Sequence, residues 1–311
     1  MSGGAMALQS PGSEILDCLV IGGGAAGLTA AMYLGRFRRR VLVVDDGKSR
    51  LWMIPKSRNV LGFPDGVAGS DLLERLRDHA SRFDVEQVQG RVDRLECDEK
   101  GKGEGFVAYA GSQVFRARKV ILATGARDIA PDIEDLEPSL KAGQIRFCPV
   151  CDGFETQGQH VAVMGREVHG LRESAFVAGF GNTVTWLSMG SRQAVPPAEL
   201  ARLEALKIKI ADGHPRAIRC TPGEGVRVET HDGQTLQFDV LYPALGLTHA
   251  SQLATALGAQ AQEDGQLEVD EHYQTTVPGL YAAGDVAVGL NQINVAAGQA
   301  AIAATDVHNR L

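Results

Sequence analysis

The apolar residues near the amino terminus fall into a strand, a helix and a second strand. A largely apolar run at 15–21 is typical of a buried parallel strand, and a helical pattern follows it at 25–37. A second apolar run occupies 41–44. This strand–helix–strand unit is long enough for a crossover connection between two parallel strands. This part of the chain therefore predicts a parallel sheet with a helix on one face.

The same pattern recurs in the middle of the chain. A strand is expected at 160–164, a helix at 171–178 and another strand at 183–187. Short alternating runs, separated by turn residues, lie outside the two units and are typical of hairpins. The hairpins are expected at 106–110 with 113–117, and at 226–230 with 236–240.

A glycine-rich loop joins the first strand to its helix. Gly22, Gly24 and Gly27 match G-x-G-x-x-G, in which the glycines serve a tight turn, a close approach to a pyrophosphate and helix–strand packing. The helix N-terminus then presents backbone amides to the phosphates. Asp45 ends the second strand, where an acidic residue can hold a ribose hydroxyl. The strand and the acidic residue favour dinucleotide binding over an incidental glycine-rich turn.

The order of these patterns predicts an α/β protein with two Rossmann-like dinucleotide-binding domains. Each is expected to have a three-layer ββα architecture, with the second domain inserted into the first. The first domain is expected to comprise residues 14–124 and 248–311, and the inserted domain residues 125–247. Residues 1–13 are small and polar and predict a disordered tail rather than a signal peptide.

Composition and charge narrow the possible functions. The 311 residues are 44% hydrophobic and 22% charged, which is ordinary for globular domains. The net charge of −7, without a stripe of Lys and Arg, argues against nucleic-acid binding. No apolar stretch approaches the roughly 18 residues of a membrane span, so we expect no membrane partner and a cytoplasmic protein. Five cysteines, an odd number, do not suggest a secreted disulfide framework.

Two of the cysteines, Cys148 and Cys151, form a C-x-x-C motif. This spacing allows a small-ring disulfide that opens and closes reversibly. The motif could instead be half of a zinc site or a pair of buried thiols. Half a zinc site needs two more ligands, and no second C-x-x-C or spaced His pair occurs, so we predict a redox pair and no metal site. Cys18, Cys97 and Cys220 have no such spacing.

The motif at 148–153, CPVCDG, lies between two dinucleotide-type units and resembles that of the low-molecular-weight thioredoxin reductases, a class of pyridine nucleotide-disulfide oxidoreductase. Four further segments resemble motifs of that family. They lie at 59–66, 123–126, 279–285 and 291–299. The resemblance extends over about residues 14–311. It implies FAD as the cofactor, a homodimer, and a thioredoxin-like protein or a small disulfide or dithiol as partner.

The resemblance also implies roles for individual residues. Cys151 is expected to lie against the flavin and Cys148 to exchange with the partner. Asp152 is expected to donate and accept protons, although a capping or turn role is an equal alternative. The residues expected to bind FAD are Gly22, Gly24, Ala25, Ala26, Gly27, Asp45, Asp46, Asn59, Gly62, Ala123, Thr124, Gly125, Gly284, Asp285, Gln292, Ile293 and Ala296.

The inserted domain departs from the family at its NADPH site. Its glycine loop keeps Gly165 and Gly170, but Glu167 stands at the second glycine. An anion about 4 Å from a phosphate costs on the order of 4 kcal/mol at an effective dielectric constant near 20. The arginine-rich segment that holds the 2′-phosphate in the family is replaced by 188–192, SMGSR. We therefore predict that this domain keeps its fold and has lost NADPH.

These features predict an FAD-dependent dithiol–disulfide oxidoreductase that works without NADPH. It would exchange electrons between the flavin, the Cys148–Cys151 pair and a protein or small-molecule thiol or disulfide, with ferredoxin, another flavin or oxygen as further electron partners. Asp152, where dithiol oxidases often carry His, favours a disulfide reductase or a general exchanger. An ordinary NADPH-dependent thioredoxin-disulfide reductase and a non-catalytic redox sensor with a flavin fold are the alternatives.

Overall fold

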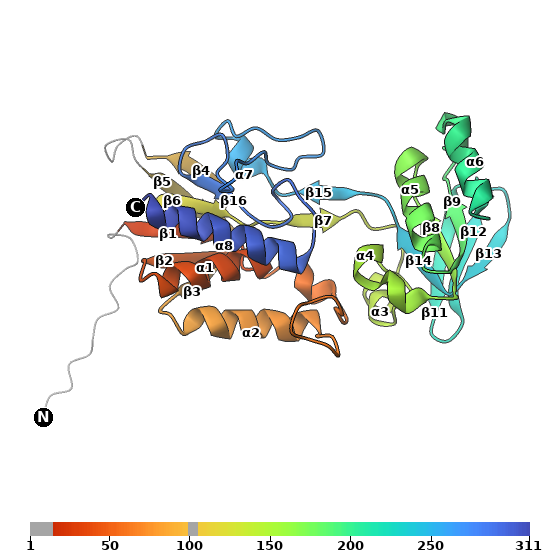
Figure 1. Cartoon of the computed structure of the whole chain (residues 1–311), viewed down its shortest axis with the longest axis horizontal. Coiled ribbons are helices and arrows are strands. Elements are labelled where there is room, and N and C mark those ends of the chain that lie inside the picture. Colours follow the sequence, from red (N-terminus) through yellow and green to blue (C-terminus); the bar gives the residue numbers. More distant parts are fainter. Residues whose placement is uncertain (1–14, 99–104) are drawn as a thin grey trace, which may run out of the picture. The chain divides into compact units, whose positions relative to one another are not determined.

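A computed structural model describes residues 15–98 and 105–311 (Figure 1). The tail predicted at 1–13 lies outside the described residues. The chain forms two compact units. Within the described residues, unit 1 comprises 15–51, 71–126 and 249–311, and unit 2 comprises 52–70 and 127–248. The sequence assigned residues 52–70 to the first domain, and the domain boundaries it gave stay a prediction.

Unit 1 is built on a seven-stranded sheet with the order β3-β2-β1-β6-β5-β4, in which β16 also pairs with β6. Strands β1, β2, β3, β6 and β16 pair in parallel, whereas β4 and β5 pair antiparallel. The strands are β1 (Leu16–Ile21), β2 (Val41–Asp45), β3 (Glu86–Gln89), β4 (Arg94–Cys97), β5 (Phe106–Ala110), β6 (Gln113–Leu122) and β16 (Leu280–Ala282). β1 and β2 are almost continuously buried, as parallel strands covered on both faces should be.

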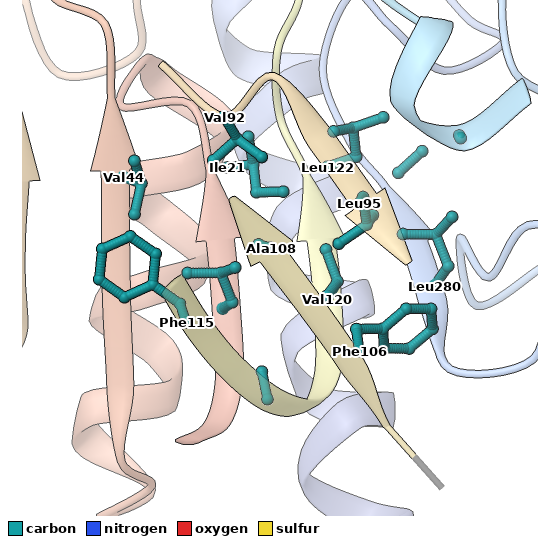
Figure 2. Close-up of a cluster of buried hydrophobic side chains, with 14 of the residues drawn as sticks. Ile21, Val44, Val92, Leu95, Phe106, Ala108, Phe115, Val120, Leu122 and Leu280 are labelled. Atoms are coloured by element: carbon teal, nitrogen blue, oxygen red, sulfur yellow. The ribbon is translucent and has the colours of Figure 1, made fainter. Parts of the chain in front are cut away.

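Helices α1 (Ala25–Arg36) and α8 (Ile293–Asn309) lie side by side and contact the sheet (Figure 1). The remaining helical segments of this part of the chain are η1 (Arg50–Met53), α2 (Gly69–Ser81) and α7 (Gln252–Thr255). Figure 2 shows the apolar cluster in which side chains of parallel strands, such as Val44 and Leu122, meet Phe106 and Phe115 of the β5–β6 hairpin. Truncating one such buried side chain costs about 2–5 kcal/mol, so this cluster fixes the sheet that carries the first glycine loop.

Unit 2 contains a four-stranded parallel sheet with the order β10-β9-β8-β14 and a separate antiparallel sheet of β11, β12 and β13. The strands are β8 (His160–Met164), β9 (Thr183–Leu187), β10 (Lys209–Ala211), β11 (Pro215–Thr221), β12 (Gly225–Thr230), β13 (Thr235–Phe238) and β14 (Val240–Pro243). The helices are α3 (Leu136–Lys141), α4 (Pro149–Asp152), η2 (Gly153–Thr156), α5 (Glu167–Ala178), η3 (Arg192–Ala194) and α6 (Pro197–Ala205). The predicted α/β class is confirmed.

One predicted strand differs in the structure, and one pair of short strands was not predicted. The alternating run at 236–240 predicts one strand, but the chain divides at Asp239 between β13 and β14, which belong to different sheets. The Asp239 carboxylate accepts a hydrogen bond from the His160 amide (2.8 Å), so this residue joins β14 to the start of β8. Strands β7 (Ala126–Asp128) and β15 (Leu247–His249) pair where the chain passes between the units.

Candidate active site

The two cysteines of the C-x-x-C motif form a disulfide around the first turn of α4. The S–S distance is 2.10 Å, and the Cys151 amide donates to the Cys148 carbonyl (2.9 Å). Pro149 is the first helical residue, where its fixed φ suits the helix and its missing N–H is not needed. The local sequence therefore holds the two sulfur atoms within one turn, which a reversible disulfide requires.

Gly153, the last residue of the motif, is fixed by packing. A Cβ at this position would lie 2.5 Å from the ring of Phe180, which follows α5. Glycine at 153 thus allows the chain after the disulfide to lie directly against α5.

Asp152 is held by two donors that spacing along the sequence did not reveal. The Tyr242 hydroxyl donates to Oδ1 (2.8 Å), and Arg146 Nη1 lies 3.0 Å from Oδ2. Burial raises the pKa of Asp152, and both donors oppose this rise because they favour the carboxylate. Tyr242 belongs to a buried strand and lies 90 residues from Asp152 in the sequence. The hydrophobic pattern around it therefore predicts only a core residue.

The first glycine loop has the geometry that its sequence predicted. Gly22 adopts a φ of +106°, and a Cβ there would lie 2.3 Å from the Ala123 carbonyl oxygen. A Cβ on Gly27 would lie 1.9 Å from the Gly22 carbonyl oxygen, so only glycine allows α1 to approach β1 this closely. Within this described segment, the first turn of α1 has no acidic residue and its N-cap, Gly24, makes no side-chain hydrogen bond. The amides at this helix end therefore suit an anion.

The two acidic residues at the end of β2, Asp45 and Asp46, support the loops around them. Asp45 Oδ1 accepts a hydrogen bond from the Gly23 amide (2.9 Å), and Arg77 Nη2 lies 3.3 Å from Asp45 Oδ2. Asp46 Oδ1 accepts from the Lys48 amide (3.0 Å). Asp45 is thus fixed directly beside the glycine loop, in the position the dinucleotide motif requires.

An ion pair near the start of α1 was also missed by the sequence analysis. Arg50 Nη1 lies 2.5 Å from Asp285 Oδ2. A Cβ on Gly284 would lie 3.0 Å from the Ala26 Cβ, and a Cβ on Gly24 would lie 3.3 Å from the Ser49 hydroxyl. Arg50 directly follows Ser49, and Asp285 directly follows Gly284. Both charged residues therefore lie next to residues that come close to the start of α1. Residues 50 and 285 are 235 positions apart, so no local pattern could have paired them.

The remaining predicted FAD residues divide between the two units. Thr124 donates to the Ala250 carbonyl (2.6 Å), and Gln292 is the N-cap of α8, which begins at Ile293. Gly125 adopts a φ of +68°, Ala25 begins α1, and Ala296 is buried within 4 Å of the Cβ position of Gly284. Asn59 and Gly62 lie in the 52–70 segment of unit 2. The Asn59 side chain accepts a hydrogen bond from Ser57 (3.0 Å), and Gly62 has a φ of +87°.

Hydrogen bonds to nearby residues occupy the second glycine loop. Glu167, at the second glycine position, adopts a left-handed φ of +48°. Its amide donates to the Ser191 hydroxyl (2.8 Å), which in turn donates to the Ser188 carbonyl (2.6 Å). The Ser188 hydroxyl donates to the Asp212 carboxylate. A backbone amide that could meet a pyrophosphate is therefore already bonded within the protein, and an exposed carboxylate stands beside it.

The two flanking glycines of this loop keep a structural role. A Cβ on Gly165 would lie 2.6 Å from the Ala244 carbonyl oxygen, and one on Gly170 would lie 2.5 Å from Gly165. The buried Trp186 indole donates to the Gly165 carbonyl (2.8 Å). Close packing of α5 on the sheet explains these two glycines without any nucleotide.

Two features of the described residues bear on other classes of function. None of their helices has the length and apolar character of a membrane span. Nor do His, Cys, Asp and Glu side chains among these residues gather in threes as a metal site would need.

Two dinucleotide-type units and a C-x-x-C disulfide define a pyridine nucleotide-disulfide oxidoreductase architecture, and the comparisons agree. Residues 16–300 match the family described as "Pyridine nucleotide-disulphide oxidoreductase". A thioredoxin reductase of Aquifex aeolicus is 30% identical over 91% of this chain and 88% of its own length. The thioredoxin reductase structure from Streptococcus pyogenes has a TM-score of 0.87 at 26% identity, over 95% of this chain and 97% of the other. The crystal structure of HlmI has a TM-score of 0.87 at 27% identity, over 95% and 92%.

The chain belongs to the pyridine nucleotide-disulphide oxidoreductase family. Within this family it is a thioredoxin reductase-like flavoprotein, an FAD-dependent disulfide oxidoreductase. The expectations of two Rossmann-like domains, of FAD as cofactor and of an enzyme of this class are confirmed. The roles of single residues stay predictions.

Proposed function

We propose that this enzyme exchanges an electron pair between FAD and a thiol or disulfide partner through Cys148 and Cys151, without NADPH. The observation that carries the NADPH-independent part is the second glycine loop, in which Ser191 occupies the Glu167 amide. The intact first loop and the disulfide support the rest.

The residues of unit 1 fit FAD. The uncapped amides at the start of α1, after Gly24, would meet the diphosphate, and Arg50 would add a cation beside Asp285. Asp45 would meet the adenosine ribose. The N-terminus of α8, which begins at Ile293 and has no acidic residue in its first turn among the described residues, would favour negative charge on the ring. Bound FAD supplies a store for the electron pair that the cysteine pair gives or takes.

The cysteine pair exchanges one disulfide for another. A partner thiolate attacks Cys148 Sγ, the Cys148–Cys151 bond breaks, and Cys151 leaves as a thiolate. A second partner thiolate then attacks the partner sulfur of the mixed disulfide, which frees the Cys148 thiolate. The partner dithiol becomes a disulfide and the protein disulfide becomes a dithiol, so two electrons and two protons are transferred. Run backwards, the same steps reduce a partner disulfide.

Asp152 is the residue that we propose to handle one of these protons. It directly follows Cys151, and its amide donates to the Cys148 carbonyl (3.2 Å). When ionised it can accept a proton from an incoming thiol, and when protonated it can return that proton to a leaving thiolate.

The partner belongs to the same proposal. A thioredoxin-like protein or a small dithiol or disulfide supplies the exchanging sulfurs, because the named relatives are thioredoxin reductases. Without NADPH, the flavin needs another electron donor or acceptor, and we propose ferredoxin, another flavin or oxygen for this role. A homodimer and a cytoplasmic location are proposed from the family resemblance alone.

Two other functions compete with this one. An NADPH-dependent thioredoxin reductase is favoured by the names of the relatives and opposed by the closed second loop. A non-catalytic redox sensor is opposed by the disulfide and by the held carboxylate beside it.

An anaerobic dithiol titration tests the proposal. Dithiothreitol added to the FAD-loaded protein should bleach the flavin absorbance. Bleaching should be abolished in Cys151→Ser and slowed at least a hundredfold in Cys148→Ser. Cys97→Ser, which alters an exposed lone cysteine, is the matched control and should behave like the parent protein. Equal bleaching rates in all four proteins, or none in the parent, would refute the proposal.

A further inference from the structure

We propose that Arg146 and Tyr242 are positioning residues that hold Asp152 as an oriented, ionised proton acceptor beside the redox cysteines. This inference rests on the proposed function, because it gives the proton chemistry of the same disulfide.

The two donors grip different oxygen atoms of one carboxylate. Tyr242 donates to Oδ1 at 2.8 Å, and Arg146 Nη1 lies 3.0 Å from Oδ2. A carboxylate held at both oxygens cannot rotate without losing a contact to a neighbour. Since Asp152 directly follows Cys151, the clamp also fixes the turn that carries the disulfide.

Backbone pairing places the two donors side by side before any proton moves. Tyr242 lies in β14, and the segment that precedes the first cysteine runs parallel to that strand through an Ile145–Leu241 bridge. The Arg146 amide donates to the Leu241 carbonyl (3.1 Å), and the Leu241 amide donates to the Gln144 carbonyl (2.8 Å). Tyr242 is therefore carried by a strand, and Arg146 by a segment that is hydrogen-bonded to that strand, which favours precise positioning.

The side chains themselves are also anchored. The Tyr242 ring is fully buried, and the Arg146 side chain is only 19% exposed. Arg146 Nε donates to the Gly143 carbonyl (3.0 Å), which directs the guanidinium toward Asp152. An anchored donor loses little side-chain entropy when it binds the carboxylate, so these contacts exceed ordinary surface ion pairs in strength.

The charges around Asp152 explain why the clamp matters for chemistry. Burial acts to raise the pKa of Asp152, and the Glu155 carboxylate acts in the same direction. Arg146 and Tyr242 are the groups that lower it. On α5, which packs against α4, the partly buried acidic residue is Glu173, and it is not among the charges that act on Asp152. Without its clamp, the pKa of Asp152 would rise further, and the carboxylate would be a less available acceptor for a thiol proton.

The test is a carboxyl titration of the oxidised protein, in which Cys148 and Cys151 cannot titrate. Aspartate carboxyl carbons are labelled with carbon-13, and Asp152→Asn assigns the resonance. Tyr242→Phe should raise the Asp152 midpoint by about one pH unit, since losing a hydrogen bond to a charge is worth about 1.5 kcal/mol. Arg146→Met should raise it further, and Arg146→Lys should restore most of the parent value.

Two matched variants separate the clamp from a general loss of stability. Tyr281→Phe removes a second tyrosine-to-aspartate hydrogen bond, from Tyr281 to Asp306 (2.7 Å), in unit 1. Arg219→Met removes an exposed arginine of unit 2 that pairs with Glu229. Neither control should move the Asp152 midpoint.

The same variants connect the clamp to exchange. The low-pH limb of dithiol-dependent flavin bleaching should move upward with the carboxyl midpoint in Tyr242→Phe and Arg146→Met. Unchanged midpoints in both variants, or midpoints that move without the bleaching limb, would overturn the inference. If the parent protein shows no dithiol bleaching at any pH, the proposed function fails, while the carboxyl titration still decides whether the clamp ionises Asp152.

Discussion

Glu173 offers a prediction that follows from burial alone. This residue lies on α5, and its Oε1 atom is buried without a hydrogen-bond partner in the described part of the chain. Burial raises the pKa of Glu173 from its ordinary value of 4.5 to about 7. A carboxyl group in this state prefers to stay protonated in the folded protein.

The sign and size of the effect follow from linkage. Below about pH 4.5, Glu173 is protonated in both folded and unfolded chains and has no pH-dependent effect. As the pH rises toward 7, only the unfolded chain releases the proton, so the free energy of unfolding falls. The difference between 4.5 and about 7 corresponds to about 3 kcal/mol. Glu173→Gln removes the ionisation, so it should stabilise the protein by about 2–3 kcal/mol at pH 8 and hardly at all at pH 4.

Urea unfolding of the FAD-loaded protein at pH 4.5, 6, 7 and 8 measures this difference. Glu204→Gln, which alters an exposed glutamate of α6 in the same unit, is the matched control and should change stability by less than about 0.5 kcal/mol. A Glu173→Gln protein whose stability gain is the same at every pH would show that Glu173 is not kept protonated. Burial would then not control the ionisation of Glu173.

Three further substitutions test other parts of the structure. Arg50→Gln should weaken FAD binding about tenfold, because it removes the cation paired with Asp285; recovery of flavin absorbance and fluorescence quenching on reconstitution measures this. Gly153→Ala should destabilise the protein by about 1–3 kcal/mol in urea unfolding, because the new methyl group meets the Phe180 ring; an unchanged midpoint would contradict the packing. Glu167→Gly should stabilise it by about 0.5–1 kcal/mol, since glycine tolerates the φ of +48°; a loss of stability would show that the side chain supports the loop.

Features that depend on residues close together in the sequence could be predicted. The spacing of Gly22, Gly24 and Gly27 after a buried strand was sufficient to place the first loop, because these three glycines and the strand before them form one short motif. The same holds for Cys148 and Cys151, whose separation alone allows the disulfide.

Features made by distant residues could not be predicted. The contacts of Asp152 with Tyr242 and of Arg50 with Asp285 join segments that meet only when the sheets have formed. The hydrophobic pattern predicts that Tyr242 is a core residue. It does not show that the Tyr242 hydroxyl donates to the Asp152 carboxylate.

The second glycine loop lies between these cases. The sequence identified Glu167 at the second glycine position of the phosphate-binding loop. It also showed that the segment at 188–192 keeps only Arg192 of the arginine-rich family motif. It did not show that Ser191 from that segment binds the Glu167 amide (2.8 Å). The two departures from the family pattern are therefore joined in this chain by a direct hydrogen bond.

An anaerobic titration of the oxidised, FAD-loaded protein tests the central claim most directly. NADPH, NADH and dithiothreitol are added separately, and the flavin absorbance is followed. The account predicts that dithiothreitol bleaches the flavin through Cys148 and Cys151, and that neither pyridine nucleotide does so at micromolar concentration. Complete bleaching by micromolar NADPH would contradict it.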